Sequence, residues 1–268
     1  MSVDRRARIG LRLLALGYLA VLLLVPVALV FYRTFEKGIG FVWESITTPA
    51  AIHALFLTLE VALITVPLNA VFGVLAAHAL VRSRFPGKRL LDALIDLPFA
   101  ISPVVVGLSL LLLYGRTGWF GPWLAEHGIQ LIFSVPGIVI ATVFVSMPFV
   151  VREVAPVLQE IGDEQEQAAA TLGASPWQTF WRVTLPAIRW GLAYGVVLST
   201  ARAIGEFGAV SIVSGKIAGE TETLTLLVEK RFQNFDLAGA YAASALLAVI
   251  ALATLGFMSV IGSRRSES

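Results

Sequence analysis

Long stretches without a charged side chain constrain this chain more than any other feature. Five of them run for 19 residues or more without Asp, Glu, Lys or Arg. They are Leu13–Tyr32, Val61–Val81, Leu97–Gly115, His127–Val151 and Leu237–Ser263. A helix needs roughly 20 mostly apolar residues to cross the hydrocarbon core of a bilayer. Each stretch therefore predicts a membrane-spanning helix.

A sixth apolar segment, Trp190–Val213, is interrupted only by Arg202 and Glu206. The composition supports a membrane protein, because 57% of the residues are hydrophobic and 14% are charged, against about 25% charged in soluble domains. We therefore expect an all-α integral membrane protein with six transmembrane helices. The formal net charge of +2 argues against a nucleic-acid partner, and the absence of cysteine excludes disulfides and thiolate chemistry.

The first predicted helix resembles a secretory signal, because Arg5, Arg6 and Arg8 precede it. Its apolar run is longer than a usual signal core, and no convincing small-residue cleavage site follows. We interpret it as an uncleaved anchor, so that residues 1–52 comprise an anchor helix and a periplasmic connection.

The basic residues predict the orientation, because cytoplasmic segments carry an excess of Lys and Arg. With the N-terminus inside, 13 of the 20 basic residues lie on the cytoplasmic side, 6 lie outside and Arg202 lies within a helix. Both termini are then cytoplasmic, including a short tail at 263–268.

The longest cytoplasmic connection, 152–189, carries the strongest local signal. An acidic run at 163–166 precedes three alanines, which favours a helix N-terminus followed by a helix. Gly173 permits a tight reversal. Ser175 and Pro176 then predict a second helix, which we expect to end at Pro186. Two interpretations remain open: an amphipathic helix pair at the membrane surface, or a docking element for another protein.

The spacing within this loop resembles the EAA motif of ABC-importer permeases. That motif reads Glu-Ala-Ala, three residues, Gly, nine residues, Ile, one residue, Leu-Pro. The matching residues here are Gln167, Ala168, Ala169, Gly173, Val183, Leu185 and Pro186. Two of them depart, because Gln167 replaces the glutamate and Val183 the isoleucine. The glutamine removes a charge, and Glu164 and Glu166 are the candidates to supply it instead.

Other segments are similar to the sulfate/thiosulfate permeases, in particular to their W-type subunit. They are 98–115, 182–190 and 201–215, with shorter matches at 85–91 and 218–221. The similarity extends over residues 53–262, which we take as the permease domain. Molybdate permeases carry a stretch similar to 201–215, so a molybdate or tungstate importer remains an alternative.

The resemblance implies a type I ABC-importer permease fold in the bacterial inner membrane. It implies a second permease subunit, two ATP-binding subunits and a periplasmic sulfate-binding protein as partners. The motif residues would then form the coupling helix that docks on the ATPase. The sequence contains no GxxxxGK[ST] motif, so ATP and Mg²⁺ are expected on the partner and no catalytic residue is assigned.

Arg202 and Glu206 are the candidates for an anion path. Arg202 lies near the middle of its predicted span, and Glu206 follows at i+4 on the same helical face. Charges inside a membrane are costly and usually face a polar cavity or a partner. Two interpretations are open. In the first, the two charges neutralise each other and fix this helix against a neighbour. In the second, Arg202 attracts a divalent anion and Glu206 weakens its binding.

Two further classes of protein compete with the permease. A membrane enzyme would need clustered acids, histidines or a nucleophile, and His53, His78 and His127 are scattered without metal-ligand spacing. No metal site is therefore expected. An ATPase-independent secondary transporter would not require the coupling motif.

Overall fold

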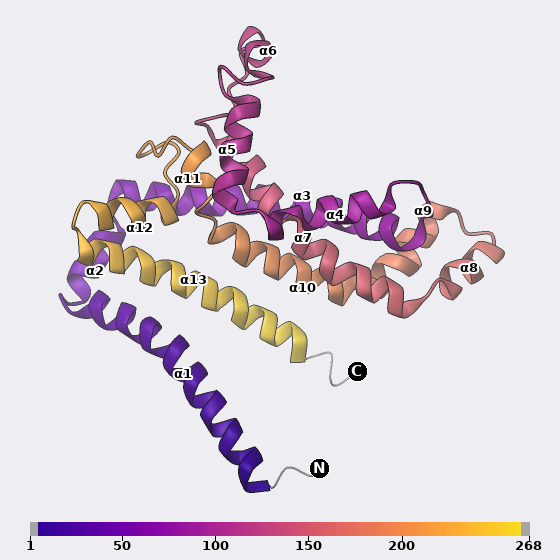
Figure 1. Ribbon diagram of the computed structural model, residues 1–268, viewed down its shortest axis with the longest axis horizontal. Coiled ribbons are helices and arrows are strands. Elements are labelled where there is room, and N and C mark those ends of the chain that lie inside the picture. The colour runs from indigo at the N-terminus through magenta and orange to yellow at the C-terminus, as the bar shows by residue number, and fades with distance from the viewer. Residues whose placement is uncertain (1–4, 264–268) are drawn as a thin grey trace.

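The computed structural model describes residues 5–263, and the regular elements within them are helices (Figure 1). Residues 1–4 and 264–268, with most of the predicted cytoplasmic tail, lie outside the described residues. The elements are α1 (Arg5–Phe35), α2 (Ile39–Ile46), α3 (Pro49–Arg82), α4 (Lys88–Ala100), α5 (Pro103–Tyr114), α6 (Gly121–Glu126), α7 (Val135–Ile161), α8 (Glu164–Thr171), α9 (Pro176–Thr179), the π-helix η1 (Phe180–Thr184), α10 (Leu185–Ile204), α11 (Val210–Val213), α12 (Leu224–Gln233) and α13 (Leu237–Ser263).

Four helices in the described part of the chain are long and apolar enough to cross a membrane: α1, α3, α7 and α13. The pair α4 and α5 would make a fifth span if it crosses as one broken unit. The structure thus confirms the all-helical class and several apolar spans. The number six and the cytoplasmic placement of both termini stay predictions.

The predicted continuous helix through Leu97–Gly115 is wrong. The chain turns by 113° between α4 and α5, with Ile101 in an extended conformation. Pro103 explains the break, because a proline disfavours helical geometry in the residue before it and has no N–H to donate. The proline then serves as a first-turn residue of α5.

Helices α3, α7 and α10 form the packed centre of the molecule, and glycines set their separation. A Cβ on Gly73 of α3 would lie 2.5 Å from Val150 Cγ1 of α7. A Cβ on Gly195 of α10 would lie 2.8 Å from Val150 Cα. Gly191 and Gly195 of α10 therefore allow close packing against α7.

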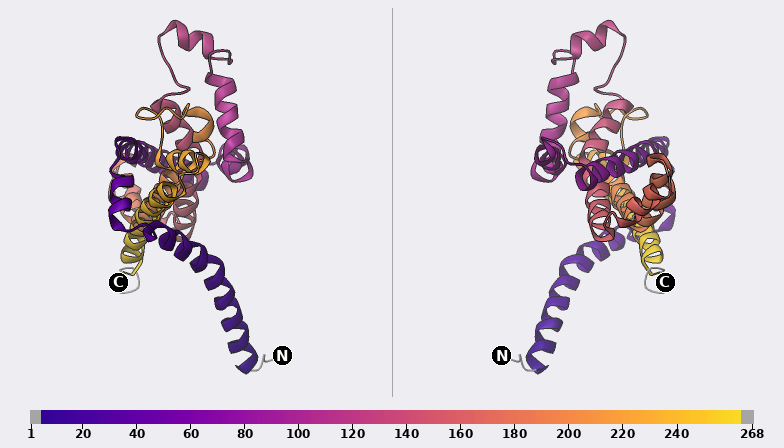
Figure 2. Two further views of the ribbon diagram at one scale, coloured as in Figure 1. Left: turned by 90° about the vertical axis from the view of Figure 1, so that its left-hand side faces the viewer. Right: turned by 90° about the vertical axis from the view of Figure 1, so that its right-hand side faces the viewer.

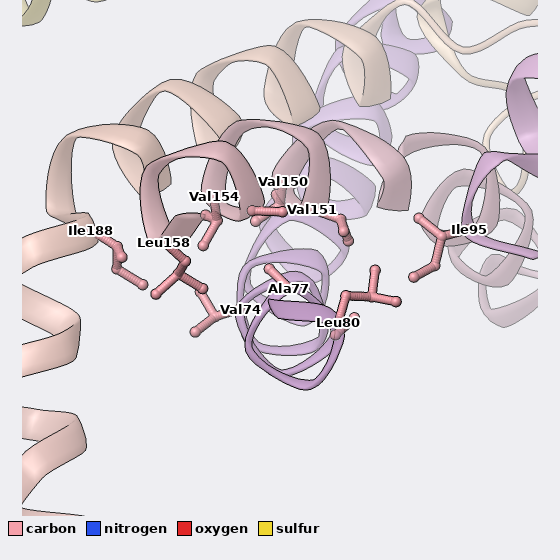
Figure 3. Close-up of a cluster of buried hydrophobic side chains, with 11 residues drawn as sticks. Val74, Ala77, Leu80, Ile95, Val150, Val151, Val154, Leu158 and Ile188 are labelled. Carbon is pink, nitrogen blue, oxygen red and sulfur yellow. The ribbon is translucent and has the colours of Figure 1, made fainter. Parts of the chain in front are cut away.

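Buried aliphatic side chains fill the end of this bundle nearest α8 (Figure 3). The cluster joins α3, α4, α7 and α10 through Val74, Ala77, Leu80, Ile95, Val150, Val151, Val154, Leu158 and Ile188. Polar contacts add to it at Asn69 of α3, which is fully buried. Its amide donates to Ser146 Oγ of α7 at 2.7 Å and to Ser199 Oγ of α10 at 3.3 Å. The three helices are thus fixed to one another by both shape and hydrogen bonds.

Helix α1 lies apart from the bundle and diverges from it (Figures 1 and 2). Its side chains are exposed from Gly10 to Leu29. Near its end, Thr34 Oγ1 donates to the carbonyl of Tyr241 in α13 at 3.0 Å. In a soluble protein such a helix would be unstable, so its surface is suited to lipid or to another membrane subunit.

At the opposite end of the long axis from α8, Arg231 of α12 joins three elements (Figure 1). Its guanidinium donates to Ser45 O at 2.9 Å and to Gly239 O at 3.0 Å, and it also reaches Thr48 Oγ1. Burial lowers the pKa of Arg231 from its ordinary value, although the nearby carboxylates oppose this shift. This residue ties α2, α12 and α13 together.

Candidate functional site

The loop at 152–189 begins inside a helix. Helix α7 continues to Ile161, so its first part extends the central bundle. Gly162 then turns the chain at φ +71° and α8 begins at Glu164, with Glu164 and Glu166 in its first turn. Gly173 follows at φ +86° and reverses the chain, as predicted.

The helix predicted from Ser175 begins as expected. The Ser175 side chain accepts from the Gln178 backbone N–H, and Gln178 accepts from the Ser175 N–H, which is a complete capping box. Its predicted end is wrong, because the chain passes through the π-helix η1 directly into α10. Pro186 lies in the first turn of α10, where proline is tolerated and does not terminate a helix.

The motif residues lie on two elements. Gln167, Ala168 and Gly173 are exposed on and after α8, at the end of the bundle. Val183 and Pro186 lie across from them on η1 and α10.

Helix α8, η1 and the start of α10 border an open groove of about 770 Å³. Its lining includes Ala168, Ala169, Leu172, Val183 and Pro186. The seventh motif residue, Leu185, points instead to the buried cluster at the base of the loop. Four of the seven motif residues therefore line this groove, and Gln167 and Gly173 are exposed beside it.

Large apolar side chains around this groove are exposed. Leu172, which lines the groove, is 89% exposed, and Trp177 on the neighbouring α9 is 70% exposed. Arginines at 182 and 189 also line the groove. Exposed apolar patches rimmed by polar groups mark binding sites for other proteins or for membranes.

Glu166 is directed into the protein rather than toward a partner. Its carboxylate accepts from Arg82 Nε of α3 at 2.8 Å and from Thr184 Oγ1 of η1 at 2.8 Å. Sequence reasoning missed this contact, because 84 residues separate Arg82 from Glu166. Glu164, by contrast, is exposed.

Arg202 and Glu206 are brought together as an ion pair, with 2.6 Å between Arg202 Nη2 and Glu206 Oε2. The side chain of Glu206 is 2% exposed and that of Arg202 is 28% exposed. The expected helical face is wrong, because α10 ends at Ile204 and Glu206 lies beyond it. Its other oxygen accepts from the Ala209 N–H at 2.9 Å, which orders the turn before α11.

The break after α10 packs against the break between α4 and α5. A Cβ on Gly208 would lie 2.9 Å from Pro103 Cβ, and one on Gly107 would lie 2.7 Å from the carbonyl oxygen of Ala209. Two interrupted segments far apart in the sequence are therefore neighbours. Irregular backbone at membrane depth is tolerated where protein surrounds it or where it lines a cavity.

Within residues 5–263, no group of three or more His, Asp or Glu side chains is arranged to hold a metal ion. The acidic run at 163–166 divides between one inward-facing carboxylate and exposed ones.

Comparison with known proteins gives consistent matches. Residues 69–267 match the family model described as binding-protein-dependent transport system inner membrane component. The chain is 54% identical over 251 residues to the sulfate transport system permease protein CysW of Synechocystis, covering 94% of this chain and 91% of that protein. It is 43% identical over 253 residues to the permease protein CysT of Escherichia coli K12, covering 94% and 90%.

A solved structure shares the fold. It is a bacterial alginate ABC transporter in complex with a periplasmic protein bound to an alginate pentasaccharide. One of its chains superposes with a TM-score of 0.80 at 18% identity, covering 98% of this chain and 97% of that one.

Proposed function

This chain belongs to the family of binding-protein-dependent transport system inner membrane components, and we propose that it is the permease subunit of an ATP-driven sulfate importer. The relatives named as sulfate permeases are similar over most of both chains, at up to 54% identity. The chain is a non-catalytic, multi-pass membrane subunit. We place it in the inner membrane of a bacterium, as the family description suggests.

The exposed groove between α8 and the start of α10 is the observation that carries the proposal. A self-contained transporter has no need of an exposed surface with apolar side chains at the end of its helix bundle. A subunit driven by another protein does need one. We propose that Gln167, Ala168, Ala169, Gly173, Val183 and Pro186 present this surface to the ATPase, with Leu185 holding its base.

The partners follow from the same reasoning. A second permease subunit completes the translocation path, and CysT, which is also similar to this chain, is the kind of protein that fits. A periplasmic sulfate-binding protein delivers the anion. We propose two ATP-binding subunits, which would bind ATP and Mg²⁺ because this sequence has no phosphate-binding loop.

The test is uptake of labelled sulfate in cells that lack this gene, with and without a plasmid copy. Restored uptake that unlabelled thiosulfate blocks and molybdate leaves unchanged supports the sulfate/thiosulfate assignment. Unchanged sulfate uptake beside lost molybdate uptake would retain an importer but replace its substrate. Uptake that persists without the ATP-binding subunits would favour a secondary transporter.

We further propose that Arg202 lines the anion path and that Glu206 weakens its hold on the anion. The partial exposure of Arg202 supports this role, since a wholly structural pair could be fully enclosed. The test is sulfate uptake by the double variant Arg202→Gln, Glu206→Gln. Removing both charges together avoids an unpaired buried carboxylate. Normal uptake in a normally assembled complex would contradict it.

A further inference from the structure

Arg82 closes the C-terminal end of α7. The last carbonyls of a helix have no partner within it, and cations are favoured there. Arg82 Nη1 donates to the carbonyl of Leu158 at 2.9 Å, and Nη2 donates to the carbonyl of Gly162. One guanidinium from the end of α3 therefore supplies the C-terminal cap of α7.

The same guanidinium holds α8. Its Nε lies 2.8 Å from Glu166 Oε2, and the two side chains are only 14% and 18% exposed. Charge-assisted hydrogen bonds with little exposure are stronger and less screened than those at the surface. The planar fork of arginine can make all these contacts at once, which a lysine ammonium cannot.

The second carboxylate oxygen of Glu166 extends the network to α10. It accepts from Thr184 Oγ1 at 2.8 Å, and Thr184 is 3% exposed. Thr184 is the last residue of η1 and directly precedes α10. π-helical turns often occur at functional positions. Glu166 thus connects α8 to the residue that directly precedes α10, the third helix of the central bundle.

We propose that the pair Arg82–Glu166, with Thr184, fixes the docking loop (the segment from α8 to η1) to α3, α7 and α10. A force applied to α8 by the ATPase would then move the bundle as a rigid body. Arg82 and Glu166 are positioning residues and need not touch the ATPase or the anion. This inference rests on the proposed function, because it assumes that α8 receives the ATPase. It also separates two neighbours: Gln167 faces outward and Glu166 anchors the loop.

The experiment uses the full complex in proteoliposomes, with the binding protein, ATP and labelled sulfate. The variants are Arg82→Lys and Glu166→Gln, with Arg84→Gln as the control, since Arg84 is an exposed arginine two residues away. We expect sulfate transported per ATP hydrolysed to fall about tenfold in both variants, the effect of losing one charge-assisted hydrogen bond. ATP hydrolysis should stay within about twofold of the unmodified complex, because the docking surface is intact.

Two results would overturn the proposal. One is an unchanged ratio of transport to hydrolysis in both variants. The other is a proportional loss of both activities, which would indicate failed assembly rather than uncoupling. A wild-type complex that hydrolyses ATP but takes up no sulfate would instead overturn the proposed substrate.

A second measurement tests this attachment of the loop without any substrate. Hydrogen exchange of the assembled complex reports local opening. In Arg82→Gln we expect exchange at the amides of α8 and η1 to rise about tenfold relative to Arg84→Gln, because the cap and the ion pair are both lost. Exchange in α5 should be unchanged. Equal protection of α8 in the two variants would contradict the attachment even where the importer carries another anion.

Discussion

Two regions of the molecule use an arginine–glutamate pair at the end of a helix, and they use it differently. At the docking loop, Arg82 and Glu166 are 84 residues apart and join α3, α7 and α8. At the break after α10, Arg202 and Glu206 are four residues apart in the sequence. The Arg82–Glu166 pair connects three helices, whereas the Arg202–Glu206 pair stabilises only the turn that follows α10.

The glycines of the two regions differ in the same way. Gly173 adopts φ +86°, which only glycine enters without strain, while Gly205 lies at φ −88°. The loop reversal therefore depends on Gly173, whereas the break after α10 does not depend on Gly205. The docking loop thus requires a backbone geometry that glycine provides, whereas the break after α10 contains the buried carboxylate of Glu206.

Glu206→Ala should have the largest effect, because it leaves Arg202 without its partner and the Ala209 N–H without its acceptor. Removing one partner of a buried pair costs about 3 kcal/mol or more. We expect a marked drop in the thermal midpoint of the assembled complex and in its yield.

The control for that prediction is Glu206→Gln, which keeps an acceptor for Ala209 and loses only the charge. It should fall between Glu206→Ala and the unmodified protein. Equal losses in the two variants would mean that the charge of Glu206, and not its role in the turn, is what the break requires.

Gly173→Ala comes next. Placing a Cβ at a left-handed position costs about 1–2 kcal/mol, and no neighbouring atom lies within 4 Å of the added Cβ, so strain is the only term. We expect affinity for the ATP-binding subunits, measured by co-purification at several salt concentrations, to fall about tenfold.

The matched control is Gly205→Ala, whose Cβ would meet only the Ala201 carbonyl at 3.4 Å. It should leave affinity and thermal midpoint unchanged. A loss as large as that of Gly173→Ala would remove the distinction between the two regions.

The features of the two regions could be predicted from the sequence only where they depend on residues close together in the chain. The turn at Gly173, the cap at Ser175 and the pairing of Arg202 with Glu206 all depend on residues within a few positions. The contact of Arg82 with Glu166 depends on how α3 and α7 pack, which no periodicity reports. The motif residues were expected to form one coupling element; four of them line the groove, whereas Leu185 packs against the buried cluster.

The same limit explains the errors in helix boundaries. Absence of charge indicates which segments suit a lipid environment, but it does not locate a break. The bend before Pro103 and the end of α10 at Ile204 fall inside uncharged or nearly uncharged sequence. Pro103 marks the first of these positions, but a proline alone does not distinguish a kinked span from a turn, because membrane helices tolerate prolines.

Thr184→Val tests the link from Glu166 to α10 alone. Valine keeps the shape of threonine and removes the hydroxyl, so a buried carboxylate oxygen loses one donor, at a cost of about 1 kcal/mol. We expect transport per ATP hydrolysed to fall about fivefold, less than in Arg82→Lys. The exposed Thr171→Val is the control. An effect larger than that of Arg82→Lys would place the main contact at η1 rather than at α3.

Gln167→Glu should have the smallest effect, and it tests the outward face of the same helix. The substitution restores the carboxylate found in the family motif beside a glutamate that already serves the interior. Exposed ion pairs contribute about 0.2–1 kcal/mol, so affinity for the ATP-binding subunits should rise by up to about fivefold. That gain should disappear at high salt, while transport per ATP stays constant. A change in that ratio would mean that residues 166 and 167 do not divide anchoring from docking, since a charge on the outer face would then alter how the bundle moves.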